Sequence, residues 1–170
     1  RGDDANEMGD ALPAVQVGGG GASSVFAGDQ TTCALSADAT VRCWGSDSFG
    51  RLGQDGSVLF NFGDSATELV SNLPAINLGE GRTALSNSIC QHWHTCAILD
   101  NNSVKCWGYN SNGQLGLGDT TDRGDRGNGM ATIPPAGVDL GSGRSAVDLC
   151  AGQSRTCAVL DNGGVKWWGF

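Results

Sequence analysis

The chain has 170 residues, which is long enough for a domain with a sizeable core. Its net charge of −8 disfavours binding to nucleic-acid phosphates, and no stretch approaches the roughly 20 apolar residues that span a bilayer. The 28 glycines and 7 cysteines favour short strands, tight turns and an oxidising compartment.

The predicted elements recur along the chain with a fixed period. A proline-containing segment reads LPAVQVG, LPAINLG and PPAGVDLG at residues 12–18, 73–79 and 134–141. Its prolines at 13, 74 and 135 are 61 residues apart (74 − 13 = 61 and 135 − 74 = 61). A hairpin-like segment follows in each copy, with tryptophans at 44, 107 and 168. Such self-similarity indicates a repeat architecture.

Each unit contains four strand-like runs, which in the third unit are GVDLG, AVDLCAG, RTCAVL and GVKWWGF. The runs are short, β-branched or alternating, and bounded by turn residues, and no window has a helical period. We therefore predict an all-β fold of four-stranded antiparallel β-propeller blades. The alternative is a β-solenoid, whose coils are usually shorter. Residues 1–170 would form one repeat domain, a partial propeller with units at about 1–60, 61–121 and 122–170, the outer two incomplete.

The hairpin segments are TCALSADATVRCWG, TCAILDNNSVKCWG and TCAVLDNGGVKWWG, beginning at residues 32, 95 and 156. If Cys96 lies opposite Cys106, Ile98 lies opposite Val104 and residues 100–102 form a three-residue loop. The last residue of such a loop tends to be left-handed. Asn102 and, in the third copy, Gly163 tolerate that conformation, whereas Ala39 in the first copy fits it less well.

Opposed residues of an antiparallel pair lie within reach of a disulfide. We therefore predict disulfides Cys33–Cys43 and Cys96–Cys106, each contributing about 2 to 4 kcal/mol. The alternatives are reduced core cysteines and a zinc site, although this spacing matches no usual zinc pattern. Two pairings stay open for the remaining cysteines: Cys150 with Cys157 across a turn, or Cys150 with Cys90. Trp167 stands where the repeat predicts a cysteine.

The stretches AGQSRTCAVLDNGGVKWWGF and HTCAILDNNSVKCWGYNSNGQLGLGDT resemble the repeats of the regulator of chromosome condensation (RCC1-like) family. The resemblance covers essentially the whole chain and implies blades of a seven-bladed propeller. Its cysteine-bearing hairpin is similar to that of secreted or surface members. Because three units cannot close such a ring, we expect either a slice of a longer protein or several chains that complete one another.

Several polar motifs are weighed against simpler roles. Asp119, Asp122 and Asp125 share a glycine-rich loop, but their spacing matches no complete calcium site, and a solvated loop is favoured. His92 and His94 lie on one side of a strand without a third metal ligand, so packing or hydrogen bonding is favoured. Asn101 begins an N-glycosylation acceptor, NNS. The tripeptide RGD occurs at 1–3 and 123–125, where a turn built into the repeat accounts for both copies.

The sequence contains no nucleophile–base set and no phosphate-binding loop, so we predict no enzymatic activity, no cofactor and no metal site. The predicted function is an extracellular or cell-surface scaffold that binds protein partners or copies of itself, as part of a surface or filament assembly, with no nucleic acid and no membrane span. The first alternative is a secreted propeller that binds and inhibits an enzyme. The second is a nucleotide-exchange regulator of a small GTPase, which the cysteine pairs and the acidity disfavour.

Overall fold

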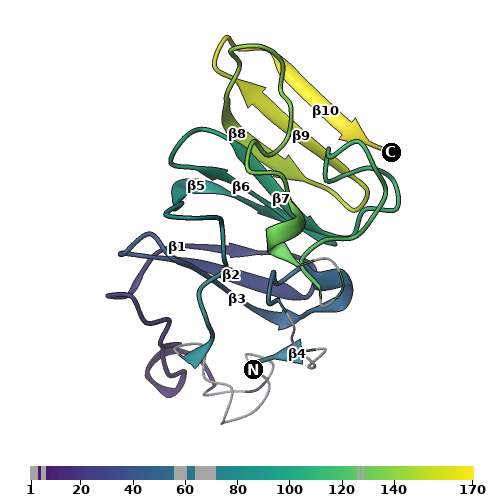
Figure 1. Ribbon diagram of the computed structural model, residues 1–170. Coiled ribbons are helices and arrows are strands. Elements are labelled where there is room, and N and C mark those ends of the chain that lie inside the picture. The colour runs from purple at the N-terminus through teal and green to yellow at the C-terminus, as the bar shows by residue number, and fades with distance from the viewer. Residues whose placement is uncertain (1–3, 5–6, 56–60, 64–71, 126, 128) are drawn as a thin grey trace.

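The computed structural model describes residues 4, 7–55, 61–63, 72–125, 127 and 129–170, and the side chains of residues 86–91 lie outside this description. The fold is all-β, with three antiparallel sheets that lie one above another in chain order (Figure 1). We call them blades 1, 2 and 3. Blade 1 consists of β1 (Ala22–Ala27), β2 (Thr31–Ser36), β3 (Val41–Ser46) and β4 (Asn61–Phe62). Blade 2 consists of β5 (Ala84–Gln91), β6 (His94–Leu99) and β7 (Val104–Gly108). Blade 3 consists of β8 (Ala146–Ala151), β9 (Arg155–Leu160) and β10 (Val165–Gly169).

Short 3-10 turns occur at η1 (Gly9–Ala11), η2 (Ser48–Gly50) and η4 (Met130–Thr132). Among the described residues there is no helix long and apolar enough to cross a membrane.

The hairpin register is confirmed. Cys96 pairs with Cys106 and Ile98 with Val104, and the equivalent pairs recur in blades 1 and 3. The last loop residue is left-handed in all three copies, with φ of 61° at Ala39, 63° at Asn102 and 80° at Gly163. Ala39 adopts this conformation because the side chain of Asp38 accepts a hydrogen bond from the amide of Thr40, which closes the same local turn as in the other copies.

The fourth strand differs from the sequence-based prediction. GVDLG (residues 137–141) is not a strand: Val138 lies in a bend, and the segment's backbone bond to β7 runs from the Val138 amide to the Val104 carbonyl at 2.8 Å. The fourth strand of blade 1 comes instead from residues 61–62, which pair with β3. In blade 2 the same position is reduced to a single bridge between Gly108 and Arg123.

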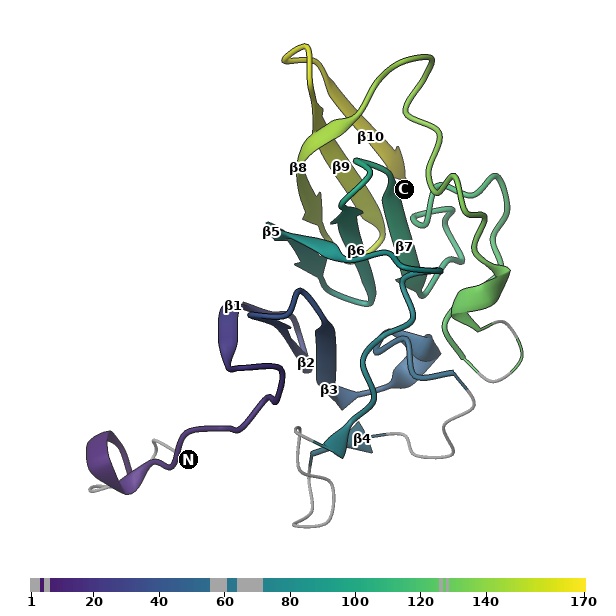
Figure 2. The same cartoon turned by 60° about the vertical axis from the view of Figure 1, so that its left-hand side comes forward.

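Two apolar cores lie between the blades. Blade 2 is covered on both faces, so all six residues of β6 are buried, and Figure 2 shows it between the other two sheets. The first core joins the cysteine-bearing face of blade 1 to Trp107 of blade 2, and the second joins the cysteine-bearing face of blade 2 to Ala158 and Leu160 of blade 3. The proline-containing segments complete both cores: Ile76 and Leu78 insert into the first, and Val138 and Leu140 insert into the second.

Candidate functional site

A repeated joint fixes each blade to the one before it. The carbonyl oxygen of Arg51, in the loop after β3, accepts hydrogen bonds from Thr95 Oγ1 at 2.9 Å and from Trp107 Nε1 at 3.1 Å. At the next joint the carbonyl oxygen of Gln114 accepts the same pair of bonds, from Thr156 Oγ1 at 2.7 Å and Trp168 Nε1 at 2.9 Å. One main-chain oxygen therefore accepts hydrogen bonds from two side chains of the following blade.

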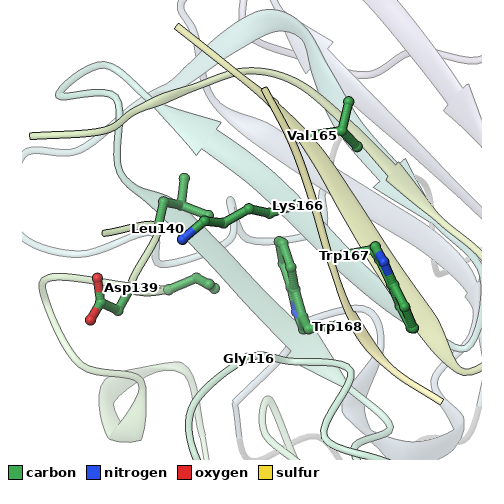
Figure 3. A pocket seen from close by; sticks show the side chains of 8 residues that line it. Gly116, Asp139, Leu140, Val165, Lys166, Trp167 and Trp168 are labelled. Atoms are coloured by element: carbon green, nitrogen blue, oxygen red, sulfur yellow. The ribbon is translucent and has the colours of Figure 1, made fainter. Parts of the chain in front are cut away.

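Glycine is required beneath each indole ring. Gly53 and Gly116 have left-handed backbones, and a Cβ atom on Gly116 would lie 2.8 Å from Nε1 of Trp168. Figure 3 shows Trp168 beside Gly116 at the edge of a pocket of about 380 Å³. The Gly-x-Leu-Gly sequence after the first two hairpins, at residues 50–53 and 113–116, therefore ends in a glycine because the loop approaches the ring closely there.

His94 adds a third bond to the second joint. Its Nε2 lies 2.6 Å from Thr156 Oγ1, which donates its own hydrogen to Gln114, so Nε2 carries the proton. Burial, and secondarily the charge of His92, lowers the pKa of His94 to about 4, so the ring is neutral at neutral pH. A histidine–hydroxyl pair would suit nucleophilic catalysis. Here both residues are buried, which makes the pair structural.

The outer face of blade 3 is defined by Cys150, Cys157, Val159, Val165 and Trp167. In blades 1 and 2 the residues equivalent to Val165 and Trp167 are buried and their exposed fractions are 0 to 1%. In blade 3 the exposed fractions are 66% for Val165 and 69% for Trp167. These two side chains lie on the opposite side of β10 from Lys166 and Trp168, which face blade 2 (Figure 3). Within the described residues, blade 3 thus leaves open the face that the other two blades bury.

In the described part of the chain, three disulfides connect strands within the blades. Cys33–Cys43 and Cys96–Cys106 join the second and third strands of blades 1 and 2, with Cα atoms 4.0 and 4.1 Å apart, and all four residues are buried. Cys150–Cys157 joins the first and second strands of blade 3 and lies on its outer face. Cys150 therefore pairs with Cys157 and not with Cys90, whose side chain lies outside the described part of the chain.

The three loop aspartates act mainly as hydrogen-bond acceptors for the main chain. Asp122 accepts from the amide of Asn110 and Asp125 from the amide of Gly127, and Asp119 forms an ion pair with Arg123 at 2.8 Å. Within the described residues, no three acidic, histidine or cysteine side chains are arranged to hold a metal ion. Arg123 of the second RGD is tied into this loop, and the first RGD lies outside the described residues. The aspartates therefore shape the loop.

Asn101 is exposed at the tip of the β6–β7 hairpin. Its Oδ1 accepts hydrogen bonds from the amide and the hydroxyl of Ser103, at 3.1 and 2.7 Å. Glycosylation at Asn101 stays a prediction.

Sequence reasoning missed a cluster of three aromatic side chains where blade 1 meets blade 2. The ring of Phe49 lies 4.7 Å from that of Tyr109 and 6.2 Å from that of Trp93, and Trp93 meets Tyr109 edge to face at 5.4 Å. These residues are 44 and 60 positions from Phe49, so no local motif connects them. The only local signal was an aromatic residue in each of three loops.

The family model described as "Regulator of chromosome condensation (RCC1) repeat" matches residues 22–51 and 92–114. These ranges contain the first hairpin with its joint loop and the second hairpin with the residues up to Gln114. The chain contains RCC1-like repeats. Its repeats therefore match known proteins at the segments that form the joints.

RCC1-like relatives match most of the chain. The ultraviolet-B receptor UVR8 of Arabidopsis thaliana is 30% identical over 142 residues, which are 84% of the chain and 28% of the receptor. The probable E3 ubiquitin-protein ligase HERC4 of Homo sapiens is 32% identical over 145 residues, which are 85% of the chain and 12% of that protein. The chain thus spans less than a third of either relative.

Two solved structures share the fold of this RCC1-like chain. Yeast RCC1 (Prp20), solved with Kap60, superposes with a TM-score of 0.62 at 19% identity, covering 88% of the chain and 32% of that structure. Human WBSCR16 superposes with a TM-score of 0.63 at 17% identity, covering 91% of the chain and 34% of that structure. Both matches are consistent with blades of a larger propeller.

Proposed function

We propose that this RCC1-like chain is a non-enzymatic extracellular scaffold that assembles through the ends of its stack of blades. The observation that carries the proposal is the outer face of blade 3. An apolar face that is buried in two blades and open in the third provides surface for protein association. The partner is a second copy of the chain, which presents a blade of the same type.

Within the described residues, the opposite end of the stack also has exposed apolar side chains. At the inner joints Ile76 and Val138 are buried between neighbouring blades, and the equivalent residue at the first end, Val15, is exposed. Leu12 and Val25 are also exposed there. Val17 packs against Ala34 of blade 1, whereas η1 lies away from the sheets (Figure 2). Docking this end onto the outer face of a second copy would bury both apolar surfaces, and such a head-to-tail contact extends into a filament unless it closes into a ring.

The disulfides support an oxidising compartment for the scaffold. Structural disulfides persist mainly in secreted and surface proteins. Three of them staple sheets that have three or four short strands each. A scaffold exposed to an extracellular environment gains stability from such cross-links.

Sedimentation velocity over a range of concentrations tests the assembly. The wild-type chain should form larger species as its concentration rises, and Val165→Glu and Trp167→Glu should each return it to the mass of one chain. Both residues are exposed, so the variants should keep the fold. Ser142→Glu, in an exposed turn of the same blade, is the matched control and should associate like wild type. A wild-type chain that stays monomeric, or a control that dissociates equally, would contradict the proposal.

A further inference from the structure

The aromatic cluster of Phe49, Trp93 and Tyr109 lies away from the outer face of blade 3 and takes no part in the joints described above. Phe49 comes from η2 of blade 1, Trp93 from the β5–β6 turn and Tyr109 from the residue after β7. Phe49 is 43% exposed, and Trp93 and Tyr109 are half-buried. The cluster is therefore a partly open aromatic surface that spans two blades.

Phe49 adopts a backbone conformation that is unfavourable for a bulky side chain. Its φ of 64° and ψ of 17° are left-handed, a region in which a bulky residue is an outlier. The equivalent residue in blade 2 is Asn112, which suits such a turn better and keeps a negative φ. Strain of this kind is retained when the side chain has a role that a better-suited residue would lose.

Carboxylates surround the chain segments that hold the rings. Asp47 is two residues before Phe49, and Asp122 accepts a hydrogen bond at 2.7 Å from the amide that follows Tyr109. The main chain at Asp125 packs against Gly50. The charge of Asp125 contributes to raising the pKa of Asp47 and of Asp122, after the larger effect of burial. The charge of Asp125 therefore repels both Asp47, in blade 1, and Asp122, in the loop after blade 2.

The described arginines near the cluster already have partners within the protein. Arg51 is buried and donates to the Ser48 carbonyl, and Arg123 is paired with Asp119. Arg126 lies outside the described residues. The chain as a whole carries a net charge of −8. An incoming cation would thus be attracted both by the local carboxylates and by the protein as a whole.

We propose that Phe49, Trp93 and Tyr109 form a recognition surface for an arginine side chain of a protein partner. A guanidinium group stacks on aromatic faces and is attracted by their π-electrons. The neighbouring carboxylates supply the complementary charge. This surface goes beyond the proposed end-to-end assembly, because it involves different residues and a different kind of contact.

Binding of a hexa-arginine peptide, measured by isothermal titration calorimetry at low salt, tests the proposal. Phe49→Leu and Trp93→Leu remove the rings without changing the charge and should each weaken binding by about three- to tenfold. Trp167→Leu removes an exposed aromatic side chain on the outer face of blade 3 and should leave binding unchanged. A hexa-citrulline peptide, which has the same shape without charge, should bind at least about tenfold more weakly.

Phe49→Asn provides a second test that does not depend on the folding of the Trp93 variant. Asparagine accepts the left-handed backbone, so the variant should unfold at the same temperature as wild type or higher while it loses peptide affinity. The proposal is overturned if wild type does not bind the peptide, if both ring variants bind like wild type, or if hexa-citrulline binds equally. Equal weakening by Trp167→Leu would also overturn it, because general attraction to an acidic protein would then explain the binding.

Discussion

Trp167 lies directly opposite Cys157 in the register of β10 and β9, the position at which Cys106 lies opposite Cys96 and forms a disulfide. Because β10 offers a tryptophan and not a cysteine, Cys157 forms a disulfide with Cys150 of β8, the strand on its other side. A single substitution thus moves the disulfide from one side of the central strand to the other.

Trp167→Cys should change the disulfide partner of Cys157 from Cys150 to the new cysteine. Cysteine at this position would recreate the hairpin pair of blades 1 and 2, so we expect Cys157 to bond to it and Cys150 to become a thiol. Peptide mapping of the oxidised protein after alkylation identifies the pairing. Trp167→Ser is the control, because it removes the indole ring without offering a sulfur and should keep Cys150–Cys157. Retention of that bond in the Trp167→Cys variant would contradict the expectation.

The three disulfides should differ in their reaction with a reductant under native conditions. The sulfurs of Cys150–Cys157 lie on an open face, whereas Cys33–Cys43 and Cys96–Cys106 are fully buried. A mild water-soluble phosphine should therefore reduce Cys150–Cys157 first, and the buried pairs should react only when the chain unfolds. Timed alkylation followed by mass spectrometry measures the order. Simultaneous reduction of all three pairs in the folded protein would show that burial does not protect them.

Gly116→Ala should destabilise the second joint by about 2 to 3 kcal/mol, because it combines left-handed strain with contact between the new methyl group and Trp168. Gly118→Ala is a close control: Gly118 is also left-handed, with φ of 79°, but nothing lies within 4 Å of its Cβ position. That control should lose only about 1 kcal/mol. Urea denaturation measures both variants, and equal losses would mean that the ring contact contributes nothing.

Stability should fall in acid because of His94. The pKa of His94 is about 4 in the folded state and 6.5 for an unperturbed histidine, so between these values the unfolded chain binds a proton that the folded chain does not. The loss should develop as the pH falls from about 6.5 to 4 and reach roughly 3 kcal/mol. His94→Gln keeps a donor toward Thr156 without a titrating ring and should flatten this dependence. His92→Gln, measured in parallel by urea denaturation, should retain most of it.

Asp47 should have the opposite pH dependence. Burial raises the pKa of Asp47 to about 6, above the 3.8 of an unperturbed carboxyl, so its charge destabilises the fold increasingly as the pH rises from about 4 to 6. Asp47→Asn should therefore stabilise the protein at pH 7 by about 1 kcal/mol, since partial exposure screens the charge. Asn110 occupies the equivalent position in blade 2 and accepts the same bond, from Leu115. Thermal unfolding at pH 4 and 7 checks this, and a variant less stable than wild type at pH 7 would contradict it.

The sequence predicted the parts of the fold that depend on local pairing. Turn residues and facing cysteines were enough to place Cys96 opposite Cys106, because a hairpin register depends on only a few neighbouring residues. Residues 137–141 were assigned to a strand because apolar residues alternate in the same way in a strand and in an irregular segment that inserts Val138 and Leu140 between two sheets. The aromatic cluster brings together residues from three separate loops, and sequence alone gave no means of bringing these loops together.

The acceptor at each joint is a main-chain oxygen, so the two hydrogen bonds do not depend on the side chain of the residue that carries it. Arginine holds the position at the first joint and glutamine at the second, yet each carbonyl receives the same two hydrogen bonds. The residue type at this position can therefore differ between neighbouring repeats while the main-chain hydrogen bonds that attach one blade to the next stay the same.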